Sequence, residues 1–319
     1  MTTPLTLNER AWRIADEMTA NAEALRIAVQ QTAGARVLDC GIAAPGGLQA
    51  GLGLARVCLA GLGEVTLAPG TFADLPCPQM QVTTDHPALA CMASQYAGWK
   101  VAVGMFFAMG SGPMRAAYGK EALFDDVSGR ERPPVAIGVL ETRKPPSDEV
   151  IAFLSERLAL PPNRLTLLAA PAASLAGCLQ VVARSVETAL HKLHELKFDI
   201  GQVVSAWGGA PLPPVAADEI AAIGRPNDAI LYGGRVVLWV RADDEQLAAV
   251  GPQVPSSASP DHGAPFAEIF ERYERKFYKI DPLLFSPAQV CFQNLRTGRS
   301  HTFGRFEPDV LRRSFFGGA

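Results

Sequence analysis

The chain has 319 residues, 48% of which are hydrophobic; this is more than one ordinary core needs and favours two domains. Its 29 basic and 32 acidic residues give a net charge of −3 without a basic block, which argues against nucleic acid or a membrane as the partner. The six cysteines are scattered without a CxxC pair, and no apolar run resembles a signal peptide or a membrane span, so we expect a soluble cytoplasmic protein.

Strand, glycine-rich turn and helix alternate in the first half of the chain, which is typical of an α/β fold. Asn8 can cap a helix over residues 8–32. We further expect strands over residues 36–40, 64–67 and 135–140 and a helix over residues 51–62. Pro145 and Pro146 cannot continue a helix or a central strand, so we expect the domain linker there. The expected domains are 1–146 and 147–319, with an approximate boundary that some segments cross.

The second half predicts a further set of α/β elements. Helices are expected over residues 148–158, 174–196 and 266–275, and strands over residues 164–169, 229–232, 236–241, 290–295 and 300–303. The last two strands flank the turn Arg296-Thr297-Gly298-Arg299 and predict a hairpin.

The segment ARSVETALHKLHEL, residues 183–196, predicts an amphipathic helix with a dense polar face. At about 100° per residue, five ionisable side chains fall opposite the apolar stripe: Arg184, Glu187, His191, His194 and Glu195. The face can be solvated, can hold a metal through Glu187, His191 and His194, or can carry a catalytic pair. HExxH order is missing, and no other His or Cys cluster supplies a further ligand, which weakens the metal hypothesis.

Two glycine-rich turns are candidates for ligand-binding loops. Residues 51–56 begin like a dinucleotide fingerprint, but Arg56 occupies the position of the third glycine. Residues 110–115, GSGPMR, can aim backbone amides and Arg115 at an anion, or can form only a tight turn. The sequence leaves both interpretations of that segment open.

Five long blocks, in order along the chain, carry a resemblance to a known family. They are TDHPALACMASQYAGW, VGMFFAMGSGPMRA, QVVARSVETALHKLHELKFD, PPVAADEIAAIGRPNDAILYGGRV and VPSSASPDHGAPFAEIFERYERKFYKIDPLLFSPAQV. Over about residues 7–315 the sequence resembles methenyltetrahydromethanopterin cyclohydrolase.

The resemblance implies an enzyme of one-carbon metabolism that interconverts 5,10-methenyl-tetrahydromethanopterin plus water with the 5-formyl form. It implies a homotrimer of two-domain α/β subunits with an interdomain substrate cleft, no metal and no tightly bound cofactor. The one-carbon carrier, tetrahydromethanopterin or a dephospho form, is the substrate. Two alternatives stay open: a metal-dependent amidohydrolase, and a pterin-binding trimer without catalysis.

The family's catalytic arginine and glutamate match Arg184 and Glu187, and its active-site segment matches Ser94-Gln95-Tyr96. Further substrate contacts are expected from Gly110, Ser111, Arg115, Asn227 and Asp228. The substrate carbon bridges two nitrogens and is already electrophilic, so a metal acting as Lewis acid is not needed. Glu187 is expected to take the proton of an attacking water that Arg184 holds.

Overall fold

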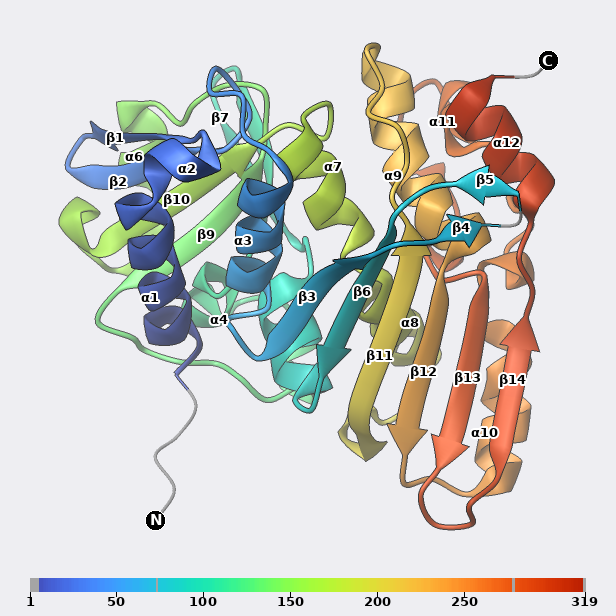
Figure 1. Ribbon diagram of the computed structural model, residues 1–319. Helices are drawn as coiled ribbons and strands as arrows, with labels where there is room; N and C mark the ends of the chain where they lie inside the picture. Colours follow the sequence, from blue (N-terminus) through green and yellow to red (C-terminus); the bar gives the residue numbers. More distant parts are fainter. Residues whose placement is uncertain (1–5, 73, 277–278, 318–319) are drawn as a thin grey trace. The chain divides into compact units, whose positions relative to one another are not determined.

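The chain forms two compact units, each with its own six-stranded sheet (Figure 1). The computed structural model describes residues 6–72, 74–276 and 279–317. Unit 1 comprises Met1–Gly63 and Leu89–Gln180, and unit 2 comprises Glu64–Ala88 and Val181–Ala319. The α/β fold class is confirmed. Two segments cross the expected boundary at residue 146, because residues 64–88 join unit 2 and residues 147–180 join unit 1.

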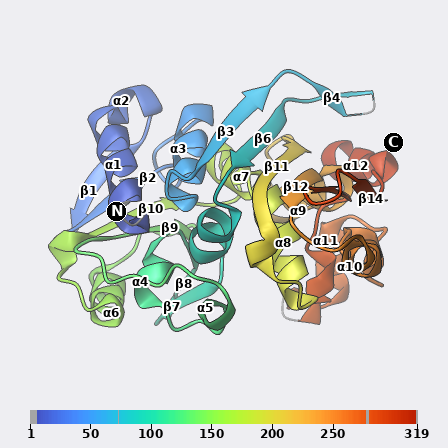
Figure 2. The same cartoon turned by 90° about the horizontal axis from the view of Figure 1, so that it is seen from below.

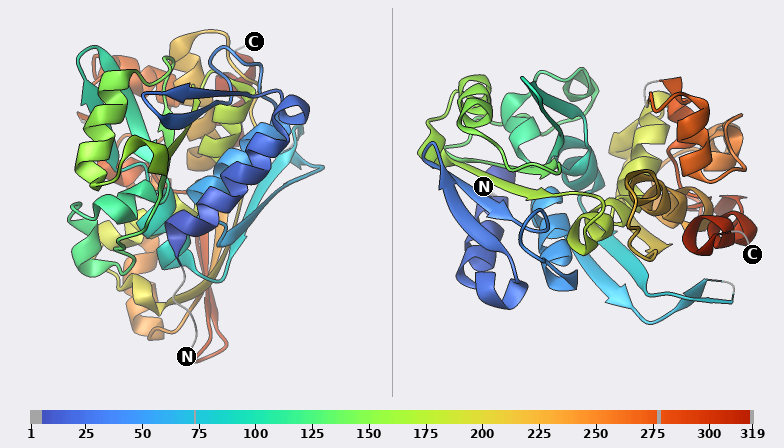
Figure 3. Two further views of the ribbon diagram at one scale, coloured as in Figure 1. Left: turned by 90° about the vertical axis from the view of Figure 1, so that its left-hand side faces the viewer. Right: turned by 90° about the horizontal axis from the view of Figure 1, so that it is seen from above.

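The sheet of unit 1 lies between two layers of helices (Figure 2). Its strand order is β1 (Ala28–Thr32), β2 (Ala35–Asp39), β10 (Leu165–Ala170), β9 (Ala136–Glu141), β8 (Phe106–Ser111) and β7 (Trp99–Val103). Strands β2, β10 and β9 run parallel, and the other neighbours pair antiparallel. One layer holds α1 (Leu7–Ala20) and α3 (Leu48–Cys58), which lie side by side in Figure 3, and the other holds α4 (Met114–Tyr118) and α6 (Asp148–Leu158).

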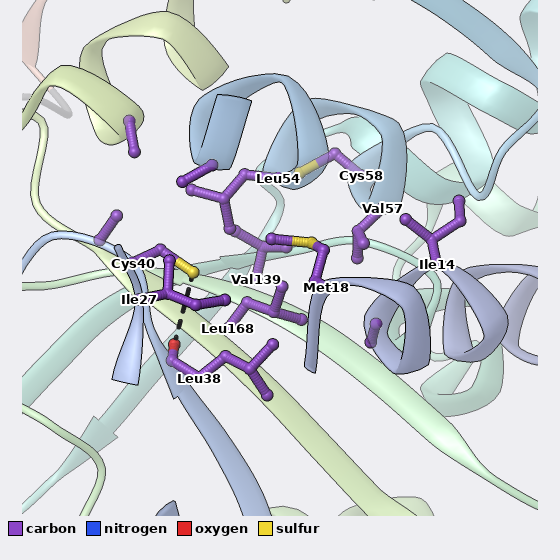
Figure 4. Packing of buried hydrophobic residues seen from close by; sticks show 14 of the residues in the cluster. Ile14, Met18, Ile27, Leu38, Cys40, Leu54, Val57, Cys58, Val139 and Leu168 are labelled. Carbon is purple, nitrogen blue, oxygen red and sulfur yellow. Dashed lines mark hydrogen bonds between the residues drawn. The ribbon is translucent and has the colours of Figure 1, made fainter. Parts of the chain in front are cut away.

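Residues that alternate along the central strands separate the two cores of unit 1. Leu38, Val139 and Leu168 point to the layer of α1 and α3, where they meet Met18 and Leu54 (Figure 4). Their neighbours Val37, Leu140 and Leu167 belong to the core on the opposite face. Burial on both faces explains why the parallel strand β10 reads as a continuous apolar run.

Asp39, at the end of β2, organises the following loop of unit 1. Its two carboxylate oxygens accept hydrogen bonds from four consecutive backbone amides, those of residues 41–44, at 2.6–2.9 Å. Burial raises the pKa of the Asp39 carboxyl. The hydrogen bonds from the four amides together lower this pKa by more, so it lies below its usual value. The stabilisation is therefore present above pH about 4 and is lost as the pH falls below that value.

We expect Asp39→Asn to lower the free energy of unfolding by roughly 2–4 kcal/mol, because its amide NH₂ cannot accept and leaves two amides unsatisfied. Urea unfolding at pH 7 measures the loss, and the difference from wild type should shrink at pH 3. Asp16→Asn is the control, since Asp16 forms an exposed ion pair with Arg36 and such pairs contribute under about 1 kcal/mol. An equal effect of both changes would contradict the role of Asp39.

The sheet of unit 2 is covered by helices on one face. Its strand order is β14 (Ser300–Gly304), β13 (Gln289–Asn294), β12 (Arg235–Val240), β11 (Val203–Pro211), β6 (Gln79–Thr84) and β3 (Gly63–Ala68). Helices α8 (Ser185–Glu195) and α9 (Glu219–Gly233) pack on β11, and α11 (Phe266–Arg272) and α12 (Pro308–Phe316) pack on α9. In β12, Val236, Leu238 and Val240 are buried whereas the two residues between them are partly exposed, as expected for a one-sided sheet.

The remaining elements connect these layers. Among the described residues they are α2 (Ala22–Leu25), β4 (Thr71–Phe72), β5 (Leu75–Pro76), a π-helix (Ala88–Gln95), α5 (Leu123–Asp126), α7 (Leu175–Val182), α10 (Asp244–Val250) and the 3₁₀ turns Pro162–Arg164, Ile200–Gln202, Gly251–Gln253, Ser256–Ala258 and Pro282–Leu284. Within the described part of the chain, no helix is long and apolar enough to cross a membrane.

Three expected elements differ in the structure. The expected helix over residues 8–32 ends at Ala20, and the chain turns through Asn21 and Arg26 before β1. The expected strand over residues 229–232 is wrong, because these residues lie inside α9. A short apolar run that is buried all round does not distinguish a helix from a strand. The expected helix over residues 174–196 is split into α7 and α8.

The expected role of Asn8 as a helix cap is also wrong. The helix begins at Leu7, so Asn8 lies in its first turn. Its buried side chain accepts a hydrogen bond from the Ile137 amide at 2.9 Å and donates one to the Pro113 carbonyl at 2.8 Å. Asn8 therefore ties α1 to β9 and to the start of α4.

Candidate active site

Arg184 and Glu187 form a buried pair at the start of α8. An Arg184 guanidinium nitrogen lies 3.8 Å from a Glu187 carboxylate oxygen, and the two side chains are only 8% and 5% exposed. The solvated-face interpretation is therefore wrong for these two residues. Charges removed from water are costly unless they are paired, so their burial indicates a specific task.

A break between two helices sets the direction of this pair. Helix α7 ends at Val182, and Arg184 is the N-cap residue of α8 with φ −93° and ψ 9°. Its carbonyl accepts the first hydrogen bond of α8, from Thr188 at 2.9 Å. Glu187 is then in the first helical turn, where the helix dipole stabilises a negative charge. Neither proline nor glycine marks this break in the sequence.

The two histidines of the same helix differ from Arg184 and Glu187 in their surroundings. Both lie near Glu195, with a nitrogen of His191 at 3.8 Å and one of His194 at 4.0 Å from the same carboxylate oxygen. Glu195 is 44% exposed. Among the residues that the structure describes, no group of three His, Cys, Asp or Glu side chains is arranged to hold a metal ion.

The segment Ser94-Gln95-Tyr96 lies at the end of a π-helix in unit 1, a rare conformation that is frequent at functional sites. The Ser94 hydroxyl donates to the Cys58 carbonyl at 2.5 Å, and the Ser94 carbonyl accepts from the Gly112 amide at 2.9 Å. Ser94 and Gln95 are fully buried, whereas Tyr96 is partly exposed. Of the three, only Tyr96 is partly exposed to solvent.

The segment over residues 110–115 forms the end of β8 and a tight turn into α4. Gly112 has φ +85°, which favours glycine. At Gly110, a Cβ would lie 3.0 Å from the backbone carbonyl oxygen of Trp99 and 2.8 Å from the terminal methyl of Met114, so the position is tight for a larger residue. The Ser111 hydroxyl points to the Val139 carbonyl at 3.4 Å. Arg115 is fully buried and bonded to Glu121, so its guanidinium faces protein groups.

Asn227 and Asp228 lie in the middle of α9 in unit 2. The Asn227 side-chain amide donates to the Ile223 carbonyl at 2.8 Å. Asp228 is fully buried and accepts hydrogen bonds from the Phe266 amide at 2.8 Å and from the Ser314 hydroxyl at 2.6 Å. Asp228 therefore joins α9 to the start of α11 and to α12.

The environment of Asp228 makes a pH-dependent prediction. Burial raises the pKa of Asp228 to about 7, although the hydrogen bonds from Ser314 and Phe266 lower it. The folded chain thus keeps a proton that the unfolded chain releases above pH about 4. The free energy of unfolding should fall as the pH rises from about 4 to 7 and then level off.

We expect Asp228→Asn to be more stable than wild type at pH 8 by roughly 1–3 kcal/mol, because asparagine cannot ionise and still accepts from the Phe266 amide. Urea unfolding at pH 5 and 8 measures this, and the difference should be smaller at pH 5. A stability difference between the variant and wild type that is the same at pH 5 and at pH 8 would contradict the raised pKa of Asp228. A tenfold or greater loss of kcat/KM in the variant would instead indicate a substrate contact at Asp228.

Lys192 is a buried group that the sequence did not single out. Its side chain is almost fully buried, and its ammonium donates to the Leu283 carbonyl. Burial lowers the pKa of Lys192 to about 8, and the nearby Asp281 charge opposes this effect. Lysine near the end of an amphipathic helix ordinarily faces water, so no signal in the sequence identified this contact between α8 and the loop before β13.

The expected site residues divide between the two units. Unit 1 holds Ser94, Gln95, Tyr96, Gly110, Ser111 and Arg115, and unit 2 holds Arg184, Glu187, Asn227 and Asp228. Within unit 1 the first set surrounds the junction of the π-helix with α4, through the Gly112 and Arg115 bonds to Ser94. Within unit 2 the structure brings together Arg184 and Glu187.

Comparison with known proteins agrees with the resemblance in the sequence. The family model described as cyclohydrolase (MCH) matches residues 6–315. A methenyltetrahydromethanopterin cyclohydrolase of Rhodopirellula baltica is 50% identical over 283 residues, covering 87% of this chain and 85% of that protein. Enzymes of the same name from Methylobacterium sp. (strain 4-46) and Methanococcoides burtonii are 47% identical over 87% of both chains and 37% identical over 98% of both chains. The chain belongs to the methenyltetrahydromethanopterin cyclohydrolase family.

Proposed function

We propose that this chain is a cyclohydrolase that interconverts 5,10-methenyl-tetrahydromethanopterin plus water with the 5-formyl form in one-carbon metabolism. The family membership supports the reaction, and one structural observation carries the mechanism: the buried pair of Arg184 and Glu187 at the start of α8. A base and a cation held at a helix junction fit a reaction that needs one activated water. The interdomain cleft stays a prediction from the family resemblance.

The substrate's own electronics define what the protein must supply. Its bridging carbon lies between two nitrogens in an amidinium-like cation and accepts a nucleophile without a Lewis acid. Glu187 takes a proton from the attacking water, and its negative charge also favours binding of the cation. The proton held by Glu187 then reaches the nitrogen that leaves the bridging carbon, while the added hydroxyl group releases its own proton to solvent. The C–N bond breaks, the ring opens, and the formyl group remains on the other nitrogen.

Arg184 acts on the same water and on the same carboxylate. At 3.8 Å the Arg184–Glu187 contact is longer than a hydrogen bond. A guanidinium carries five N–H donors, and in the proposed mechanism Arg184 directs one of them to the water and later to the developing formyl oxygen. Arginine and the helix N-terminus both interact favourably with the negative charge of Glu187. Because the electrophile is already activated, the placement of the water matters more here than a strong base.

The assay is loss of the methenyl chromophore after addition of the purified protein, with and without a strong chelator. Turnover that is equal in both conditions supports the proposal. Turnover abolished by the chelator and restored by a metal ion would support the amidohydrolase alternative with Glu187, His191 and His194. Binding of the pterin without turnover would support the non-catalytic alternative.

We further propose that the protein is a cytoplasmic homotrimer that holds no cofactor tightly and takes tetrahydromethanopterin, or a dephospho form, as carrier. The family likeness supports the trimer, and the burial of five of the six cysteines fits a reducing compartment. Sedimentation of the purified chain tests the trimer, and a mass equal to 33.9 kDa would contradict it.

A further inference from the structure

A fully buried arginine lies beneath the end of the π-helix in unit 1. Arg115 comes from the short helix α4 and is 0% exposed, while its partner Glu121 is 17% exposed at the side chain. The two form a bidentate pair, with nitrogen–oxygen distances of 2.9 and 2.6 Å. Bidentate pairs of this kind combine strength with a fixed geometry.

The same guanidinium also bonds to the π-helix itself. It donates to the Met92 carbonyl at 2.9 Å and to the Ser94 carbonyl at 3.4 Å. Carbonyl groups in the last turn of a helix lack partners within the helix, and Arg115 supplies a donor for two of them. The backbone of the π-helix is thereby fastened to α4 immediately before Tyr96.

The ring of Tyr96 packs against this ion pair. The Arg115 guanidinium carbon lies 4.8 Å from the centre of the Tyr96 ring, within the range of a cation–π contact. The following turn is equally tight, because a Cβ on Gly98 would lie 2.2 Å from a Glu121 oxygen and 2.6 Å from a Tyr96 ring carbon. The backbone at Gly98, the Glu121 carboxylate and the Tyr96 ring therefore pack closely against one another.

We propose that Arg115 and Glu121 form a clamp that holds Tyr96 in place to bind the pterin. Arg115 is a positioning residue and touches no substrate, in contrast to the anion contact that its sequence position allowed. This inference rests on the proposed function, because it assigns the partly exposed Tyr96 to the substrate. An ion pair buried this deeply is not needed for stability, since apolar residues of similar volume serve as well, so its geometric precision is the property that the fold uses.

The first test compares steady-state kinetics of the full chain and of Arg115→Lys. Lysine keeps the charge but cannot bond to the carboxylate and two carbonyls at once. We expect KM for methenyl-tetrahydromethanopterin to rise about tenfold with kcat within about threefold, the pattern of lost uniform binding. Gly98→Ala keeps the Arg115 side chain but crowds both the Glu121 carboxylate and the Tyr96 ring, and it should raise KM in the same way. A lower kcat with an unchanged KM in both variants would overturn the proposal.

A double-mutant cycle tests whether Arg115 acts through Tyr96. In a Tyr96→Ala background, Arg115→Lys should change KM by less than about twofold, because the residue that it positions is absent. Independent, multiplicative effects would overturn the proposal. Arg130→Lys is the matched control, because Arg130 follows α5, donates to the Gly119 carbonyl and is 50% exposed at the side chain. The KM of this variant should stay at the wild-type value.

Hydrogen exchange separates the clamp from the proposed function. Amides of residues 91–99 should exchange at least about tenfold faster in Arg115→Lys, while those of α6 keep their wild-type rates. If the amides of residues 91–99 exchange at the wild-type rate in Arg115→Lys, the clamp is overturned, regardless of the KM and kcat values. If the wild-type chain shows no turnover, the proposed function fails, and the exchange result still decides whether Arg115 holds the segment.

Discussion

Glu187→Gln is expected to lower kcat by roughly 10²–10⁴-fold, while the substrate still binds. Glutamine has the size of glutamate and fits the same buried position, but it cannot take a proton from water. Some loss of affinity is expected as well, because the carboxylate charge favours the cationic substrate. Stopped-flow measurement of the methenyl chromophore gives the rate, and equilibrium titration gives the affinity.

The control for this variant is Glu195→Gln on the same helix. Glu195 is 44% exposed and lies beside the two histidines, so its neutralisation should leave kcat within about twofold of wild type. Near-normal kcat in Glu187→Gln would remove the general-base role. Equal losses in the two variants would point to the charge of the helix rather than to one base.

Arg184→Lys is expected to lower kcat by on the order of 10- to 100-fold, although the net charge is unchanged. Lysine lacks the planar fork that holds a carboxylate and a water together. If Arg184 only kept Glu187 ionised, lysine would serve as well, since a glutamate is ionised at neutral pH in any case. Turnover measured from pH 5 to 9 separates the two roles.

The exposed Arg241 provides the matched control, and Arg241→Lys should have wild-type kcat across this range. Activity of Arg184→Lys close to wild type at pH 7 would contradict the positioning role. Activity that is low at every pH, with substrate affinity retained, is the result that the geometry of α8 predicts.

Elements with strong local signals were predictable from the sequence. The helix over residues 148–158 is confirmed with both bounds, and the hairpin of β13 and β14 is confirmed around the predicted turn. At the start of the helix over residues 148–158, the N-cap residue Ser147 makes no side-chain capping hydrogen bond. Asp148 and Glu149 in the first turn interact favourably with the helix dipole instead. The local sequence pattern therefore predicted the helix but not the contacts of its side chains.

Tertiary packing decided the features that the sequence did not reveal. The break between α7 and α8 carries no glycine or proline, and the π-helix over Ala88–Gln95 has the composition of an ordinary buried helix. The π-helix makes contacts with distant residues: the Arg115 hydrogen bonds to Met92 and Ser94 connect residues more than 20 positions apart. Such pairings are invisible to periodicity.

The candidate site was only partly accessible to sequence reasoning. Helical spacing correctly placed Arg184 and Glu187 one turn apart, but it left open whether they face water. The burial of Arg184 and Glu187 could be recognised only from the fold of unit 2. The same limit applies to Asp228 and Arg115, whose polar side chains indicated ligand contacts although the structure gives them protein partners.

The most direct test of the account is a structure of the Glu187→Gln chain with methenyl-tetrahydromethanopterin bound. The substitution stops turnover, so the intact substrate can be observed. The account predicts a single water molecule between the bridging carbon and the side chain of residue 187. That water should lie roughly 2.6–3.2 Å from the side-chain oxygen and should also contact Arg184. A bridging carbon bound out of reach of both residues would contradict the account.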